Sequence, residues 1–233
     1  MFVKICANTN LADAQMAAEL GADAVGFVFA PSKRRVSVEQ VAEITPHLPG
    51  SVLTVGVFAT REAKAIVDAV GGSGLGGVQL HSSPDAALLE ELNCGFEGRV
   101  RLIQTVSYAI DAEDREAADE QFVAALQTAV SAPAVWAVLL DAARGGVSGG
   151  LGARFDWEHA AGLVRQVYAE AGENGGNLPK LIVAGGLRAE NVREAIGALH
   201  PWGVDVASGV ESVPGKKDPE RMRLFLAAAR ESL

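Results

Sequence analysis

Short, almost wholly apolar segments alternate along the chain with longer segments in which apolar residues recur every three or four positions. The short segments are typical of strands covered on both faces, as the strands of a parallel sheet are. The longer segments are typical of amphipathic helices that cover such a sheet. Strands are predicted over residues 2–6, 24–29, 52–58, 77–81, 100–105, 135–140, 180–184 and 204–206, with a helical segment after each.

Eight strand–helix pairs in a chain of 233 residues predict an α/β fold, a single (β/α)8 TIM barrel with a parallel eight-stranded core. A doubly wound open sheet is the alternative, but it needs fewer strands and normally has a diagnostic first turn. No shift in composition marks a second domain, so we expect residues 1–233 to form one barrel domain. Residues 172–177 are interpreted as an insertion at the non-catalytic end of the barrel.

The chain has a formal net charge of −9 and a pI near 5.0. Proteins that bind nucleic acids or anionic membranes carry basic patches, so neither partner is expected. No apolar run approaches the ~18 residues of a membrane span. The first strand begins at residue 2 and leaves no room for a targeting peptide, and two cysteines make no disulfide framework. These features favour a cytoplasmic protein.

Three patterns that resemble cofactor or metal motifs lack the context that such motifs need. Residues 72–77 match G-x-G-x-x-G but follow a helix and precede a strand, the reverse of a dinucleotide site, so a turn is expected. The glycine-rich segment 145–152 lacks the Lys-Ser/Thr of a P-loop. The histidines and cysteines show no metal-ligand spacing, and Cys94, near a helix end, is interpreted as structural. No metal and no cofactor is expected.

Glycine directly follows the last two strands, at Gly185-Gly186 and at Ser208-Gly209. Glycine lets a ligand approach backbone N–H groups closely. In (β/α)8 barrels these two loops form the usual phosphate site, so phosphate binding is predicted here. Ordinary glycine turns are the alternative.

Two side chains at strand ends carry acid–base chemistry. Asp141 leaves a buried strand, where removal from water raises a carboxyl pKa and suits it to general acid work; a loop cap is the alternative. Cys6 ends the first strand and is either functional or a packed thiol. Lys4 shares the strand face of Cys6, so it can contribute to stabilising a thiolate.

Two arginines, Arg34 and Arg35, follow the second strand. A guanidinium here can clamp a carboxylate or phosphate with two hydrogen bonds. The alternative is a solvated loop charge, which we expect of one of the two.

Motifs along the whole chain resemble those of the phosphoribosylanthranilate isomerase family of tryptophan biosynthesis. In chain order they are Val3-Lys4-Ile5-Cys6 with Thr9-Asn10, Gly21-Ala22-Asp23, Gly26-Phe27-Val28-Phe29, Ser32-x-Arg34-x-Val36-Ser37, Val55-Gly56-Val57-Phe58, Val78-Gln79-Leu80-His81, Leu139-Leu140-Asp141, Gly149-Gly150-x-Gly152, Phe155-Asp156-Trp157, Ala184-Gly185-Gly186-Leu187, Val204-Asp205-Val206-x-Ser208-Gly209-Val210-Glu211 and Pro214-Gly215-x-Lys217-Asp218-Pro219. Each motif alone is weak, whereas their order and spacing are specific.

The resemblance implies an Amadori rearrangement without cofactor or metal, in which N-(5-phosphoribosyl)anthranilate becomes 1-(2-carboxyphenylamino)-1-deoxyribulose 5-phosphate. It implies that Asp141 is the general acid and Cys6 the general base. It also implies substrate binding by Arg34, which would hold the anthranilate carboxylate, and by His81. The backbone at residues 185, 186, 208 and 209 would hold the phosphate. The partner expected is this small-molecule substrate, and monomer and homodimer are both left open.

Three positions depart from the expected family pattern: Ala7 and Ser82 each replace a glycine, and Leu151 replaces a small hydroxyl residue. If the glycine before Asn8 serves a positive φ, a Cβ there costs roughly 1 kcal/mol or more and can shift Cys6. Two alternatives follow. One is a catalytically silent phosphate-binding barrel, and the other is a histidine-pathway-type phosphoribosyl isomerase, against which Cys6 argues because that enzyme resembles this one but has an aspartate there.

Overall fold

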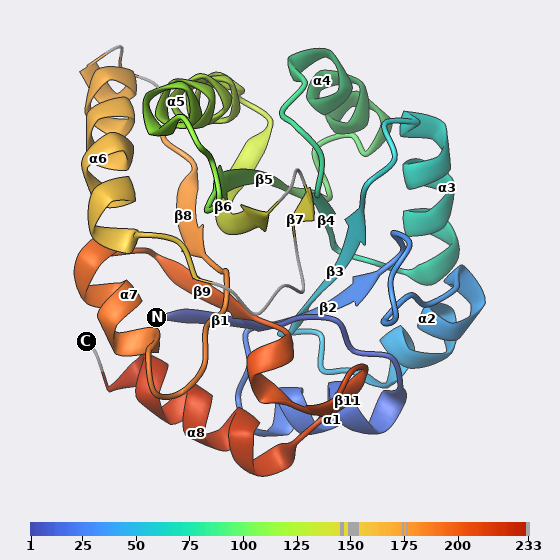
Figure 1. Cartoon of the computed structure of the whole chain (residues 1–233). Helices are drawn as coiled ribbons and strands as arrows, with labels where there is room; N and C mark the ends of the chain where they lie inside the picture. The colour runs from blue at the N-terminus through green and yellow to red at the C-terminus, as the bar shows by residue number, and fades with distance from the viewer. Residues whose placement is uncertain (145–146, 149–153, 174, 176, 232–233) are drawn as a thin grey trace.

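Eight parallel strands form a closed ring within the part of the chain that this computed structural model describes, residues 1–144, 147–148, 154–173, 175 and 177–231. Around the ring they are β1 (Phe2–Ile5), β2 (Ala24–Val28), β3 (Leu53–Phe58), β4 (Gly77–Leu80), β5 (Arg101–Ala109), β6 (Val135–Arg144), β8 (Lys180–Val183) and β9 (Gly203–Val206). Pairing of β5 with β6 and of β9 with β1 closes the barrel. Figure 1 looks down its axis. The predicted barrel is confirmed.

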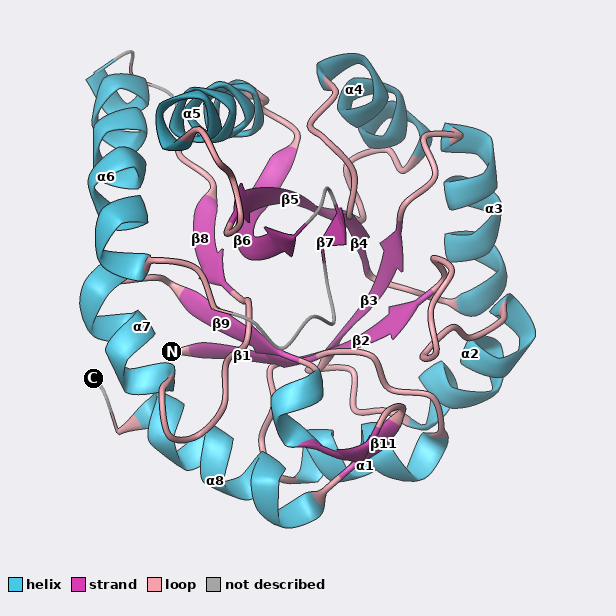
Figure 2. Ribbon diagram, viewed as in Figure 1, coloured by secondary structure: helices cyan, strands magenta, loops and turns pink. Residues whose placement is uncertain are grey.

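Helices surround the strand ring (Figure 2). They are α1 (Leu11–Glu19), α2 (Val38–Ile44), the 3-10 turn η1 (Thr45–His47), α3 (Ala63–Ser73), α4 (Ala86–Gly95), α5 (Arg115–Ser131), α6 (Trp157–Glu173), α7 (Val192–Leu199) and α8 (Pro219–Arg230). Polar side chains start several of them: Ser37 and Gln40 form a capping box on α2, and Asp218 caps α8. No helix in the described ranges is long and apolar enough to cross a membrane.

Four short elements lie at the C-terminal end of the barrel. Strand β7 (Val147–Ser148) pairs antiparallel with the end of β6. The 3-10 turn η2 (Ser208–Val210) follows β9 and leads into a hairpin of β10 (Glu211–Val213) and β11 (Lys216–Lys217). This hairpin lies beside α1 in Figure 2.

The side chains of the barrel alternate between two cores. Residues pointing outward, such as Val3 and Ile5, pack in a large cluster with the helices. A smaller apolar cluster fills part of the barrel interior. It consists of Ala24, Val55, Ile103, Ala137, Leu139, Ile182 and Ala184. The period of two along each strand then directs Lys4, Gln79 and Asp205 inward above that cluster. The barrel interior therefore changes from apolar to polar toward its C-terminal end.

Two strands are longer than predicted, whereas the other six begin and end within one residue of the prediction. Strands β5 and β6 continue to pair past residue 105, through Ser107↔Asp141 and Ala109↔Ala143. Asp141 therefore lies inside β6, where we had placed it after the strand end. The ends of β5 and β6 supply each other's backbone hydrogen-bond partners, which neither segment has on its own.

Three other local predictions are corrected. Helix α3 extends to Ser73, so the glycine-rich turn begins only at Gly74, whose φ of 67° ends the helix. Helix α6 includes Gly172 and ends at Glu173, so the segment interpreted as an insertion starts inside the helix. Cys94 lies near the end of α4 as expected, but it is exposed and does not contribute to the core. The segment 145–152, with Leu151, lies outside the described residues except for β7.

Candidate active site

Cys6 lies directly after β1, with its side chain directed into the mouth of the barrel and only 6% exposed. Its N–H donates to the Val206 carbonyl at 2.8 Å, which continues the pairing of β1 with β9. The thiol lies over Gly26 of β2, because a Cβ on that glycine would be 2.6 Å from Sγ. The absence of a side chain at Gly26 therefore provides the space that Cys6 occupies.

Ala7 has a φ of 61°, so the position does require the left-handed backbone that the sequence comparison suggested. A non-glycine residue there costs about 1 kcal/mol. The following residue, Asn8, holds the loop in place. Its Nδ2 donates to the carbonyls of Ile5 at 2.8 Å and Gly26 at 3.3 Å. The backbone of Cys6 is thus fixed from both neighbouring strands despite the alanine.

A buried polar network lies beneath the thiol. Lys4 has no exposed surface, and its Nζ donates to Asp205 Oδ1 at 2.8 Å and to Gln79 Oε1 at 3.0 Å. Gln79 in turn donates to Thr105 at 3.1 Å. Burial lowers the pKa of Lys4, but the Asp205 carboxylate and the neighbouring thiol outweigh this and raise the pKa above its usual value. Lys4 is therefore a permanent cation under Cys6.

Burial raises the pKa of the Cys6 thiol, and Lys4 opposes this by lowering it. The predicted contribution of Lys4 thus has the expected direction, although desolvation is the larger effect and the net pKa is raised. Lys217 also lowers this pKa, so two lysines favour the thiolate without offsetting burial.

Asp141 is half-buried and belongs to β6, which β9 and β8 separate from β1 around the ring (Figure 1). Burial raises the pKa of its carboxyl to about 6, while His81 and the N–H of Ala142 lower it. That N–H donates to Asp141 Oδ1 at 2.8 Å. Such a pKa leaves a useful protonated fraction near neutral pH, as a general acid requires.

His81 follows β4 and brings a second strand end toward Asp141, to which it is electrostatically coupled. Its backbone N–H donates to Phe58 O at 2.7 Å and continues the β3–β4 pairing. The predicted residues Cys6, His81 and Asp141 therefore come from three strands and face one interior.

Arg34 lies in the loop after β2 and makes a forked ion pair that the sequence did not reveal. Its Nε donates to Glu211 Oε1 at 2.8 Å, and its Nη2 donates to Glu211 Oε2 at 2.7 Å. Lys217 donates to the same carboxylate at 3.2 Å. Glu211 and Lys217 were parts of recognised motifs, but no role was assigned to them. The signal in the sequence that could have identified them is a pair of opposite charges six positions apart, just after the last strand.

The loops after β8 and β9 pack against each other and depend on their glycines. Gly185 has a φ of 83°, and a Cβ on it would be 3.3 Å from Asp141 Oδ1. A Cβ on Gly209 would be 1.9 Å from the Leu187 carbonyl oxygen. Asn191 secures the first loop by donating to Gly186 O at 3.1 Å. The predicted phosphate loop at Gly185 therefore lies directly beside the predicted acid, Asp141.

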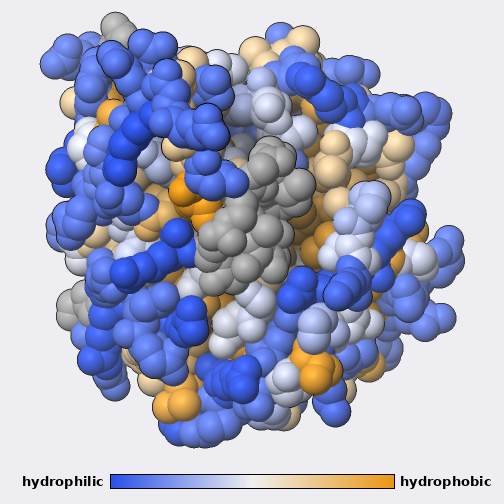
Figure 3. All heavy atoms as spheres, in the orientation of Figure 1, coloured by the Kyte–Doolittle hydropathy of each residue, from blue (hydrophilic) through white to orange (hydrophobic). Residues whose placement is uncertain are grey.

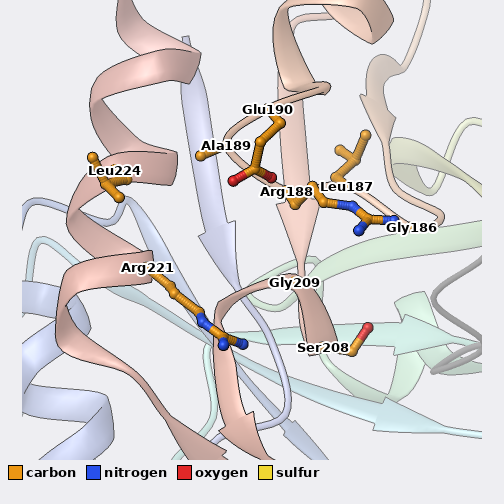
Figure 4. A pocket seen from close by; sticks show the side chains of 9 residues that line it. All are labelled: Gly186, Leu187, Arg188, Ala189, Glu190, Ser208, Gly209, Arg221 and Leu224. Atoms are coloured by element: carbon orange, nitrogen blue, oxygen red, sulfur yellow. The ribbon is translucent and has the colours of Figure 1, made fainter.

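A pocket of about 490 Å³ lies along these loops (Figure 4). Its lining includes three of the four predicted phosphate-binding residues, Gly186, Ser208 and Gly209. Arg188 and Arg221 add two positive charges to its wall and Glu190 one negative charge, which leaves one positive charge. The sequence alone did not single out these three residues. The pocket combines the backbone of two glycines with two guanidinium groups, an arrangement that can bind an anion.

The face that carries these residues is polar around its rim, with apolar surface beside the centre (Figure 3). Among the described residues, no group of three His, Cys, Asp or Glu could hold a metal ion. One acid, one thiol, one guanidinium and an anion pocket thus meet at one end of the barrel. This arrangement can move protons on an anionic substrate.

Comparisons with known proteins show the family to which the chain belongs. Residues 3–228 match the family model described as N-(5'phosphoribosyl)anthranilate (PRA) isomerase. The isomerase of Desulforudis audaxviator is 38% identical over 231 residues, covering 99% of this chain and 98% of the relative. That of Rubrobacter xylanophilus is 39% identical, with 98% of each covered. The crystal structure of the Thermotoga maritima enzyme is 35% identical, with a TM-score of 0.77 over 99% of both chains.

Another similar structure is a phosphoribosyl anthranilate isomerase in complex with reduced 1-(o-carboxyphenylamino)-1-deoxyribulose 5-phosphate. It is 34% identical, with a TM-score of 0.75 over 99% of both chains. Because both the family model and these relatives match nearly the full length, the chain belongs to the N-(5'-phosphoribosyl)anthranilate isomerase family.

Proposed function

We propose that this protein converts N-(5-phosphoribosyl)anthranilate, an aminoaldose, into 1-(2-carboxyphenylamino)-1-deoxyribulose 5-phosphate, an aminoketose, in tryptophan biosynthesis. The observation that carries the proposal is the pairing of an acid and a thiol in the mouth of the barrel. Asp141 has a pKa of about 6, and Cys6 lies at the end of β1, above a buried lysine. Membership of the isomerase family supports the same reaction.

Asp141 is proposed as the general acid. Protonation of the furanose ring oxygen breaks the bond between that oxygen and C1′ and leaves an iminium cation between C1′ and the anthranilate nitrogen. With a pKa of about 6, about one tenth of Asp141 is protonated at pH 7. The hydrogen bond from the Ala142 N–H orients the carboxyl, and Gly185 lies against the same oxygen.

Cys6 is proposed as the general base that removes the C2′ proton. Burial opposes thiolate formation, but the substrate iminium is a cation next to C2′. That charge favours loss of the thiol proton to solvent at the stage where the base is needed, and Lys4 adds to it. Loss of the proton neutralises the iminium and gives an enolamine, which tautomerises to the ketone. No atom is gained or lost overall.

The remaining residues are proposed to bind the substrate. Arg34 would hold the anthranilate carboxylate, since a guanidinium matches a carboxylate with two hydrogen bonds. The backbone at Gly185, Gly186, Ser208 and Gly209 would hold the phosphate, and the anion pocket beside them supports this. His81 would contact the ribose portion near Asp141. We also propose that residues 1–233 act as one cytoplasmic catalytic domain, as a monomer or homodimer.

Variant kinetics test these roles. Phosphoribosylanthranilate is generated from anthranilate and followed by its fluorescence. Cys6→Ser and Asp141→Asn are each expected to lose most of kcat, whereas Arg34→Ala mainly raises KM. Near-normal turnover in either of the first two variants removes that residue from the mechanism, and an unchanged KM in the third refutes the carboxylate contact.

A further inference from the structure

Two buried charges in the hairpin after β9 have no part in the mechanism described so far. Glu211 is 5% exposed and Lys217 is 2% exposed. They face each other across the hairpin, as register partners of β10 and β11. Burial of a charge is costly unless it is paired and hydrogen-bonded, so a buried pair beside a binding site calls for a reason.

The contacts of Glu211 point toward Arg34. Both carboxylate oxygens accept from one edge of that guanidinium, at 2.8 and 2.7 Å. Glu211 Oε1 also accepts from the N–H of Gly215 at 3.3 Å and from Lys217 Nζ at 3.2 Å. Arg34 Nη1 makes no hydrogen bond to any described residue. The guanidinium is thus held along one edge while its other edge faces outward from the pair.

The hairpin is fastened to the loop that carries the thiol. Thr9 Oγ1 donates to the Gly215 carbonyl at 2.6 Å, and the N–H of Lys217 donates to Asp13 Oδ2 at 2.8 Å. Lys217 Nζ donates further to Ala207 O at 3.1 Å, just after β9. Arg34 is therefore held at a fixed place relative to Cys6, although the two come from different loops.

The charges of this cluster do not cancel. Arg34 and Lys217 contribute one positive charge each and Glu211 one negative charge, which leaves one positive charge. Although burial raises the pKa of Glu211, its contacts with Arg34 and Lys217 lower it below the usual value, so the carboxylate is ionised at neutral pH. Burial lowers the pKa of Lys217 below its usual value, and Glu211, which keeps the ammonium paired, opposes that shift. Without Lys217, Glu211 would fully compensate the charge of Arg34.

We propose that Glu211 and Lys217 are positioning residues that make Arg34 selective for a substrate carboxylate. Glu211 orients the guanidinium, and Lys217 balances Glu211 so that the cluster keeps the charge that attracts a second carboxylate. This inference rests on the proposed function, in which Arg34 meets the anthranilate carboxylate. It assigns specificity for the carboxylate-bearing aminoaldose to a hairpin that touches no reacting atom.

Steady-state kinetics with two substrates test the assignment. One is phosphoribosylanthranilate, and the other is its aniline counterpart, which lacks the carboxylate and forms from aniline and ribose 5-phosphate. Glu211→Gln and Lys217→Met are each expected to raise KM for the first substrate about ten-fold, the effect of ~1.4 kcal/mol of lost interaction. Glu211→Gln leaves kcat within about threefold of the parent value, and both variants leave KM for the aniline substrate within about twofold, since they reach the carboxylate through Arg34. Lys217 also lowers the pKa of Cys6, so Lys217→Met is expected to lower kcat by the same factor with both substrates.

Matched variants separate positioning from general damage. Lys216 is the exposed neighbour of Lys217, so Lys216→Met controls for loss of a hairpin lysine and is expected to leave both KM values unchanged. The double variant Glu211→Gln/Lys217→Met removes one charge of each sign. It is expected to raise KM about ten-fold, as each single variant does, and not by the product of the two effects, because Lys217 acts on Arg34 only by balancing Glu211.

The Arg34→Ala background gives the decisive comparison. There, Glu211→Gln is expected to change KM by less than about twofold, since its effect passes through Arg34. An equal rise in KM for both substrates overturns the assignment and identifies the hairpin as structural only. So does a rise in KM for phosphoribosylanthranilate that is as large in the Arg34→Ala background as in the parent protein. Failure of the proposed function would be seen separately, as absence of turnover in the parent protein.

Discussion

Replacement of Asp141 by asparagine is expected to stabilise the fold, and to do so more at alkaline than at acidic pH. The carboxyl has a pKa of about 6 in the folded protein against 3.8 for an ordinary aspartate. The folded state therefore binds the proton more tightly than the unfolded chain. Stability from the protonated carboxyl is complete below pH 3.8 and is lost as pH rises through about 6.

The size of the effect follows from the two pKa values. A shift of about 2 units corresponds to about 3 kcal/mol of destabilisation by the ionised carboxylate above pH 7. At pH 5 the same linkage gives about 1.6 kcal/mol, so the difference between pH 8 and pH 5 is about 1.4 kcal/mol. Asp141 retains some contact with solvent, which reduces the expected difference to about 1 kcal/mol. Asparagine keeps an oxygen for the Ala142 N–H.

Urea unfolding of the parent protein and of Asp141→Asn at pH 5 and pH 8 measures this difference. Asp68→Asn serves as the control, because Asp68 is exposed and pairs only with Lys64 on the surface of α3. The gain in free energy of unfolding should be larger at pH 8 for Asp141→Asn and equal at both pH values for the control. A gain that does not change with pH, or a loss that grows toward pH 8, would refute the assigned environment of Asp141.

Three further predictions concern the thiol, its loop and the acid. Gly26→Ala places a Cβ 2.6 Å from Cys6 Sγ, so kcat should fall by about ten-fold or more while the fold persists, as circular dichroism and kinetics can check. Ala7→Val puts a β-branched residue at a φ of 61° and should lower the free energy of unfolding by ~2 kcal/mol or more in urea titration; unchanged stability would contradict the left-handed backbone. Above pH 6 the loss of protonated Asp141 offsets the growing thiolate fraction of Cys6, so kcat/KM should rise from pH 5 to pH 6 and then level off; a tenfold rise per pH unit that continues to pH 8 would exclude Asp141 as the acid.

The sequence predicted the elements that depend mainly on residues close together in the chain. Apolar segments bounded by glycine and polar residues located all eight barrel strands, and the period of two placed Lys4 and Cys6 on one face. Strand-end position selected Cys6 and Asp141 as inward-facing residues at the mouth. The backbone requirement at Ala7 followed from a single substitution in a recognised motif, and its φ of 61° confirms it.

The features that the sequence did not predict depend on contacts between distant segments. Arg34 and Glu211 are 177 positions apart, and only the closed barrel and the hairpin bring them together. The extension of β6 past Asp141 depends on pairing with β5, since neither segment is strongly apolar there. The raised pKa of Cys6 likewise reflects burial among several strands, which outweighs the lysine that the strand period revealed.

The central claim is that this barrel converts the aminoaldose into the aminoketose with Asp141 and Cys6. Its most direct test follows phosphoribosylanthranilate fluorescence with purified protein and identifies the product by ¹³C NMR. Protein-dependent loss of the substrate and a new ketone carbon at C2′ are expected, with both abolished in Cys6→Ser. Consumption at the uncatalysed rate, or a product without the ketone, would contradict it.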